Sequence, residues 1–168
     1  MYKDRTKNIV LSGFISALMI ISLYAGCIIR NNRIFFMALS TYFESIPIII
    51  GGVKVGFLCY IASSLLSLIL LPDKIYAFIF LIFGVYPIIK YFCEKESIIK
   101  EYIFKYIWFN FFMVLTYFLY KKIIIINSEM IKNSILMLII ILEVLFFIYD
   151  YVFTKFITYV KYRILKEE

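Results

Sequence analysis

Histidine is absent from this 168-residue chain, and its absence removes several kinds of chemistry at once. Ser–His–Asp and Cys–His nucleophilic sites need an imidazole base, and many zinc sites use imidazole ligands. The sequence has no H-E-x-x-H motif and no G-x-x-x-x-G-K-[ST] nucleotide-binding loop. We therefore predict that the chain is not an enzyme, with no catalytic residues, no metal site and no cofactor.

Charged residues are also scarce, at 17% of the chain, whereas 64% of residues are hydrophobic and the mean hydropathy is +0.96. Soluble domains are about 45–50% apolar. Disorder is excluded because the chain is too apolar. The composition predicts an all-α integral membrane protein in contact with lipid. The net charge of +7 then indicates basic cytoplasmic loops and not a nucleic-acid partner.

Six apolar runs are long enough, or nearly so, to cross a bilayer, which takes about 20 residues. They cover residues 9–29, 34–50, 53–71, 75–93, 102–120 and 134–153. The sequence therefore predicts one transmembrane domain over residues 1–168, folded as a bundle of six transmembrane helices. Three cysteines without a C-x-x-C pair predict free thiols.

Basic residues near the ends of these spans predict the orientation of the chain. If the N-terminus is cytoplasmic, the inside collects twelve of the eighteen Lys and Arg residues and the outside six. Cytoplasmic loops carry an excess of Lys and Arg. We therefore expect a multi-pass protein of the cell (plasma) membrane with both termini in the cytoplasm.

Three acidic residues, Glu44, Glu143 and Asp150, fall inside the predicted spans. A charge at the centre of a membrane helix costs about 2.5–3.5 kcal/mol on insertion scales, so each acid requires a reason. Glu143 and Asp150 are seven residues apart and share a helix face with Phe147. A buried amide such as that of Asn110 needs partners. We treat Glu143, Phe147 and Asn110 as candidate substrate-binding residues.

A structural role is the alternative for all of these polar residues. Glu44 lies three residues before Pro47, which lacks an amide and loosens the helix. Asp150 could pair with Lys155 or be held by Thr154, which would make it structural. We therefore list Glu44 and Asp150 as buried polar residues and leave their function open.

The first span has a face of small residues that could admit another helix. Ser12 and Ser16 are four residues apart, as are Gly13 and Ala17. The stretch G-F-I-S-A at 13–17 is similar to the A-x-x-x-A motif of the S components of energy-coupling-factor (ECF) transporters, with Gly in place of the first Ala. Residues 46–56, I-P-I-I-I-G-G-V-K-V-G, are similar to the segment that joins helices two and three in that family.

This resemblance implies a substrate-binding membrane subunit of a micronutrient transporter. Its first helix, through Ser12, Gly13, Ser16 and Ala17, would dock a transmembrane coupling subunit, and partner ATPases would supply energy for transport of an unknown small molecule. The second half, with G-V-Y-P-I-I-K at 84–90, also resembles an uncharacterised polytopic family of low-GC Gram-positive bacteria. The alternatives are a structural or assembly protein of the cell envelope and a small proton-coupled carrier.

Overall fold

The computed structural model describes residues 2–94, 98–123 and 135–166, and these residues are helical or lie in short connections, with no strand among them. The helices are α1 (Tyr2–Ile28), the short η1 (Arg30–Asn32), α2 (Arg33–Gly51), α3 (Val53–Leu70), α4 (Lys74–Phe83), α5 (Tyr86–Cys93), α6 (Ile98–Ile123) and α7 (Ile135–Lys166). The predicted all-α fold is confirmed over this part of the chain.

Within the described residues, four stretches are long and apolar enough to cross a membrane. They are Thr6–Ile28, Arg30–Gly51, Val53–Leu70 and Lys74–Cys93. They match the first four predicted spans and are compatible with a multi-pass membrane protein. The fifth and sixth predicted spans correspond to α6 and α7, which are not among the four. Residue 134, where the sixth span was expected to begin, lies outside the described residues.

The fourth predicted span is not one continuous helix, because the chain divides it into α4 and α5. The amide of Gly84 still donates to the Phe80 carbonyl at 2.7 Å. Pro87 stands in the first turn of α5, where its missing amide is tolerated. The same proline could not donate to the preceding turn of a continuous helix, so the two helices meet at residues 84–85.

The connections between the first helices follow from a few residues with special roles. Gly52, at φ 79°, separates α2 from α3 in a backbone conformation that favours glycine. Asp73 caps α4 by accepting a hydrogen bond from the amide of Tyr76 at 3.1 Å. The Nζ of Lys74 donates to three carbonyls at the end of α3, at 2.7–3.1 Å. These tight connections make consecutive helices antiparallel neighbours.

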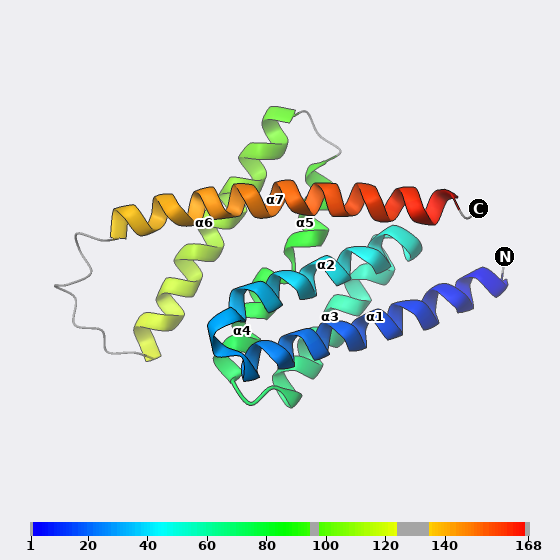
Figure 1. Cartoon of the computed structure of the whole chain (residues 1–168), viewed down its shortest axis with the longest axis horizontal. Helices are drawn as coiled ribbons and strands as arrows, with labels where there is room; N and C mark the ends of the chain where they lie inside the picture. Colours follow the sequence, from blue (N-terminus) through cyan, green and yellow to red (C-terminus); the bar gives the residue numbers. More distant parts are fainter. Residues whose placement is uncertain (1, 95–97, 124–134, 167–168) are drawn as a thin grey trace.

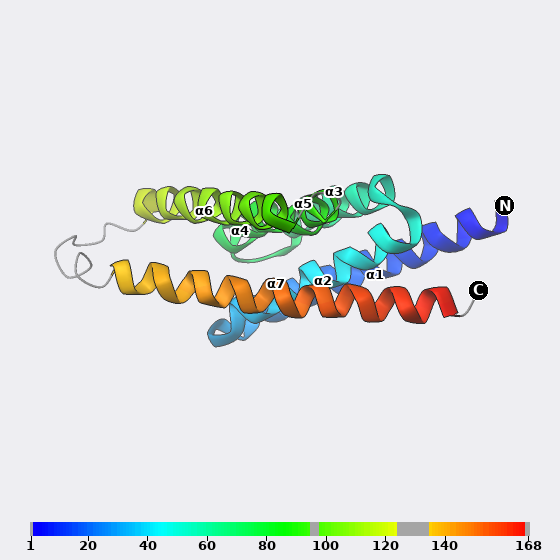
Figure 2. The same cartoon turned by 90° about the horizontal axis from the view of Figure 1, so that it is seen from above.

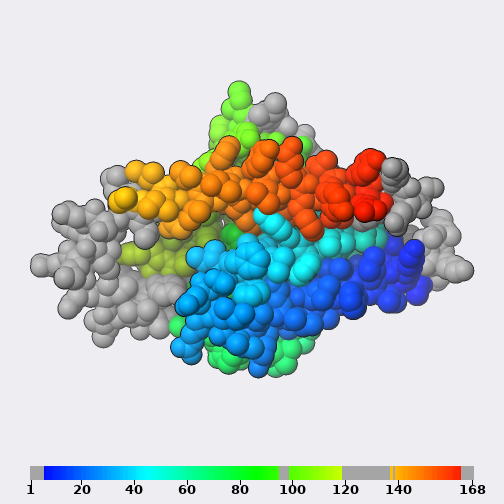
Figure 3. Space-filling view, viewed as in Figure 1, coloured from blue at the N-terminus to red at the C-terminus, as the bar shows by residue number. Residues whose placement is uncertain are grey.

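The helices are arranged in two layers, which Figures 1 and 2 show from perpendicular directions. One layer holds α1, α2 and α7, and these three helices form the face seen in Figure 3. The other layer holds α3, α4, α5 and α6. The beginning of α1 and the end of α7 lie at the same end of the bundle. This placement agrees with termini on one side of a membrane.

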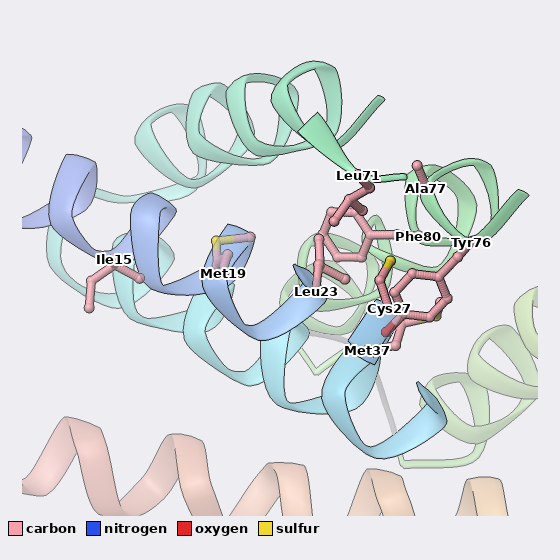
Figure 4. Close-up of a cluster of buried hydrophobic side chains, with 9 residues drawn as sticks. All are labelled: Ile15, Met19, Leu23, Cys27, Met37, Leu71, Tyr76, Ala77 and Phe80. Atoms are coloured by element: carbon pink, nitrogen blue, oxygen red, sulfur yellow. The ribbon is translucent and has the colours of Figure 1, made fainter. Parts of the chain in front are cut away.

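Three apolar clusters pack between the helices of the described chain, the smallest around Ile48, Tyr60 and Ile88. The first gathers buried side chains of α1, α2 and α4 around Leu23 and Phe80 (Figure 4). The second is aromatic and includes Phe109 and Phe146, whose rings stack with centroids 4.1 Å apart. All three cysteines are buried and free, so the prediction of free thiols is confirmed.

Candidate functional site

Asp150 of α7 is the centre of a buried ion cluster that joins three helices. Its Oδ1 accepts hydrogen bonds from the Tyr86 hydroxyl at 2.5 Å and from the Lys90 ammonium group, both on α5. Its Oδ2 accepts a hydrogen bond from Lys105 of α6 at 3.0 Å. Both carboxylate oxygens therefore have hydrogen-bond partners within the chain itself.

The two lysines of this cluster are deeply buried and each has further partners. Lys90 is 0% exposed and Lys105 is 1% exposed. Lys90 also donates to the Thr154 hydroxyl at 2.7 Å and lies 3.2 Å from the Glu94 carboxylate. Lys105 donates to the Glu101 carboxylate at 2.5 Å. The ammonium groups are thus neutralised and hydrogen-bonded where water is excluded.

A cluster in which the central charges are paired is suited to holding helices together. Breaking a buried pair leaves an uncompensated charge, so its members are strongly coupled. The partners of Asp150 differ from the sequence-based expectation. Lys155 is exposed and lies 5.5 Å from the ring centroid of Tyr151, so it does not pair with Asp150. Thr154 is nearby as expected, but its hydroxyl donates to the Asp150 main-chain carbonyl at 2.9 Å.

Glu44 of α2 differs from Asp150, because its carboxyl group lacks hydrogen-bond donors among the described residues. It is 0% exposed, and both of its carboxyl oxygens are buried without a hydrogen-bond partner in the described part of the chain. Ser40, one turn earlier on the same helix, is also fully buried, and its hydroxyl has no partner in the part of the chain that the structure describes. An unsatisfied buried polar group costs about 1–3 kcal/mol. Glu44 is therefore a buried acid without a hydrogen-bond partner among the described residues.

Tyrosines of two other helices lie near this acid, and their hydroxyls have partners of their own. Tyr60 of α3 donates to the main-chain carbonyl of Leu81. The Tyr149 hydroxyl of α7 is 2.7 Å from the hydroxyl of Thr41, one turn of α2 before Glu44. Within the described part of the chain, neither tyrosine donates to the Glu44 carboxyl.

Glu143 of α7, the first candidate for substrate binding, is only half satisfied. Its Oε1 accepts a hydrogen bond from the Asn110 amide at 2.9 Å, and its Oε2 is buried without a partner in the described chain. The structure thus brings together two of the three predicted site residues. Phe147, the third, is 50% exposed on the outside of α7, whereas Asp150 of the same predicted face is 7% exposed.

The small residues of α1 divide between two faces. Ser12 and Ser16 are buried, and the Ser16 hydroxyl donates to the Ser12 carbonyl at 3.0 Å. Gly13 and Ala17 are exposed, and no heavy atom would lie within 4 Å of a Cβ at Gly13. Of the four predicted docking residues, two are therefore packed within the bundle and two are open to a partner.

Sequence reasoning placed Lys90 and Lys105 among the basic residues near the cytoplasmic ends and missed their burial. Their burial could have been inferred from the sequence, because both lysines lie within apolar helical stretches and not in loops. No group of three or more Cys, Asp or Glu side chains in the described ranges could hold a metal ion.

Comparisons with known proteins give no relative from which to transfer a role to these residues. No family model, no curated protein and no solved structure matches this chain.

Proposed function

We propose that this chain is an integral membrane protein that binds a small solute inside its helix bundle and is not itself a catalyst. The observation that carries the proposal is Glu44, whose two buried carboxyl oxygens lack a partner within the described chain. Acids inside membrane helices are rare, and they mark substrate and ion pathways. A solute with a cationic or hydrogen-bond-donating group would supply the missing partner.

Among the three acids of the predicted spans, Glu44 is the one best placed for this role. Asp150 has three side-chain donors, and Glu143 has one, from Asn110. Glu44 has none among the described residues. Pro47, which follows within one turn, lacks the amide that would hold the Phe43 carbonyl, so α2 is less tightly bonded beside the acid.

For the transport role, we propose a micronutrient-binding subunit of the ECF type, as the resemblance implies. The outward direction of Gly13 and Ala17 supports a coupling subunit that docks on α1. Partner ATPases would supply energy, because the chain has no nucleotide-binding loop. The protein would lie in the plasma membrane with both termini in the cytoplasm, in agreement with their placement at one end of the bundle.

A proton-coupled carrier is the second candidate, because an unpartnered buried carboxyl is also suited to taking up a proton. Such a carrier would pass the proton between acids inside the spans, of which Glu44 and Glu143 are the two outside the ion cluster. Glu143 instead bonds to Asn110, and no hydrogen bond joins the two acids within the described residues. Solute binding at Glu44 is therefore the better-supported proposal.

The test is the identification of small molecules that copurify with the protein. Wild type and Glu44→Gln would be purified in mild detergent, denatured, and the released compounds identified by mass spectrometry. We expect an enriched compound in the wild type that is missing from Glu44→Gln, since the amide keeps the shape and loses the charge. Glu143→Gln is the matched control and should retain the compound.

Two results would contradict the proposal. Equal recovery of the same compound from wild type and Glu44→Gln would remove Glu44 from the site. Release of no enriched compound from wild-type protein purified from its own host would count against solute binding altogether. A melting temperature measured for each variant separates loss of binding from loss of folding.

A further inference from the structure

A pocket lies at the end of the bundle where α1 joins α2 and where α3 joins α4. It has a volume of about 360 Å³. It is lined by Cys27, Arg30, Arg33, Pro72, Asp73, Lys74 and Ile75. Ligand pockets for small molecules have volumes of about 300–1,000 Å³, so this one holds a small group.

Arg33 and Glu44 are eleven residues apart on α2, roughly 16 Å along the helix axis. The pocket is therefore separate from the acid discussed above.

The lining of this pocket is strongly cationic. Three basic side chains, Arg30, Arg33 and Lys74, face one carboxylate, Asp73, which leaves a net charge of +2. The pocket also adjoins the beginning of α2, which has no side-chain cap and no acidic residue in its first turn. The ends of α1 and α3 also meet at this pocket, so the dipoles of the four helices oppose one another and the basic side chains decide the attraction for an anion.

The hydrogen bonds inside the pocket identify which donors remain for a ligand. One terminal nitrogen of Arg33, Nη1, pairs with Asp73 Oδ2 at 2.8 Å, and its Nε is buried without a partner in the described chain. The three donors of Lys74 are occupied by main-chain carbonyls at the end of α3. Lys74 therefore contributes charge, while Arg33 has an unused N–H and Arg30 is exposed at the rim.

We propose that this pocket binds a phosphate group, either of a phospholipid headgroup or of a free phosphate compound. A phosphate monoester carries about −1.5 to −2 charges at neutral pH, and the phosphodiester of a phospholipid carries one, so the net +2 of the lining attracts either. Arginine guanidinium groups bind phosphate through parallel hydrogen bonds, and the Nε–H of Arg33, which has no partner among the described residues, is one such donor. The lining lies at the ends of three of the apolar stretches, since it includes the end of Thr6–Ile28 and the beginnings of Arg30–Gly51 and Lys74–Cys93. A bilayer crossed by these helices would have its headgroups at this level. This proposal does not depend on solute binding at Glu44.

Cys27, which is 8% exposed and lines the pocket, provides a reporter within the site. Replacing Cys59 and Cys93 by Ala leaves it as the single thiol of the chain. The rate of its reaction with the neutral reagent N-ethylmaleimide would be measured in maltoside detergent, which contains no phosphate. We expect inorganic phosphate to slow the reaction in a saturable manner, and sodium chloride of equal ionic strength to have no such effect.

The two sources of the phosphate group are distinguished by repeating the measurement in phosphatidylglycerol nanodiscs. If headgroups occupy the pocket, Cys27 is protected in nanodiscs before any phosphate is added. If a free phosphate compound is the ligand, protection in nanodiscs still requires added phosphate. Reaction at the same rate under every condition would overturn the proposal.

Substitution of the two arginines and measurement of the melting temperature test phosphate binding without relying on the reactivity of Cys27 alone. Arg30→Gln and Arg33→Gln should each weaken the apparent phosphate affinity about tenfold or more, because hydrogen bonds to charged groups are strong. Lys54→Gln, at the opposite end of α3, is the control and should leave it unchanged. Phosphate should also raise the melting temperature of the wild type relative to chloride. Absence of this rise, or an equal rise in both arginine variants, would contradict the proposal.

Discussion

Asp150 of α7 forms an ion pair with Lys90 of α5, although sixty residues separate them in the sequence. The second oxygen of the same carboxylate binds Lys105 of α6, forty-five residues away. One buried carboxylate therefore holds three helices in a fixed relation. A pairing of this kind makes the stability of the bundle depend on a single charge.

The first prediction concerns removal of this charge. Asp150→Asn keeps the size of the side chain but leaves two buried ammonium groups without their common partner. We expect it to lower the free energy of unfolding by about 3–5 kcal/mol, the range for breaking a buried pair. Lys155→Gln, at an exposed position, should change it by less than about 0.5 kcal/mol. Unfolding in detergent micelles, followed by circular dichroism, measures both.

Non-additivity is the second expected property of the cluster. Replacing Lys90 by Met and Asp150 by Leu together removes both charges, so neither is left buried and alone. The double variant should be more stable than the sum of the two single losses predicts, by about 0.5–3 kcal/mol. Strictly additive losses would contradict the view that Lys90 and Asp150 act as one unit.

The sequence predicted the helices better than it predicted these partners. Apolar run length and flanking charges located both ends of α2 and α3 and the end of α1 within one residue, while α1 begins at Tyr2, seven residues before the predicted span. The break between α4 and α5 was not predicted, because a Gly and a Pro inside a membrane helix can kink it or divide it, depending on the packing around them. The partners of Asp150 could not be predicted, since they depend on how α5, α6 and α7 pack across the bundle.

The candidate acids show the same limit. Their position inside apolar spans indicated that Glu44, Glu143 and Asp150 require partners. Which of the three is satisfied depends on contacts between helices that are distant in the sequence. Glu143 and Asp150 share a heptad spacing, yet one bonds to an amide and the other to two lysines.

The third prediction concerns the stability of the empty protein. Glu44→Leu removes a buried carboxyl whose oxygens have no partner in the described chain and replaces it with an apolar group. If no ligand is present, we expect the variant to be more stable than wild type by about 1–3 kcal/mol. Thermal unfolding of ligand-free protein is the measurement. A strong loss of stability would show that Glu44 has a structural role and would oppose the proposed function.

The fourth prediction concerns orientation. Reporter fusions after Lys100 and at the C-terminus should both give a cytoplasmic signal, because the basic residues are distributed twelve to six in favour of that side. The beginning of α1 and the end of α7 lie at one end of the bundle, so a fusion at either terminus should report the same side. An extracellular signal at Lys100 would reverse the predicted orientation.

The last prediction tests whether α1 is the surface for a coupling partner. Gly13→Leu places a bulky side chain where no atom lies within 4 Å of the Cβ position, so the fold should not be disturbed. Glycine within a helix costs roughly 0.5–1 kcal/mol relative to alanine, so stability should be equal or slightly higher. If a transmembrane coupling subunit docks on Gly13 and Ala17, pull-down from the native host in mild detergent should recover it with wild type but not with Gly13→Leu.

Gly26→Ala is the contrasting variant, because its Cβ would collide with the Tyr76 hydroxyl and lower stability. Equal recovery of the coupling subunit by wild type and Gly13→Leu would exclude this face of α1 as the docking surface.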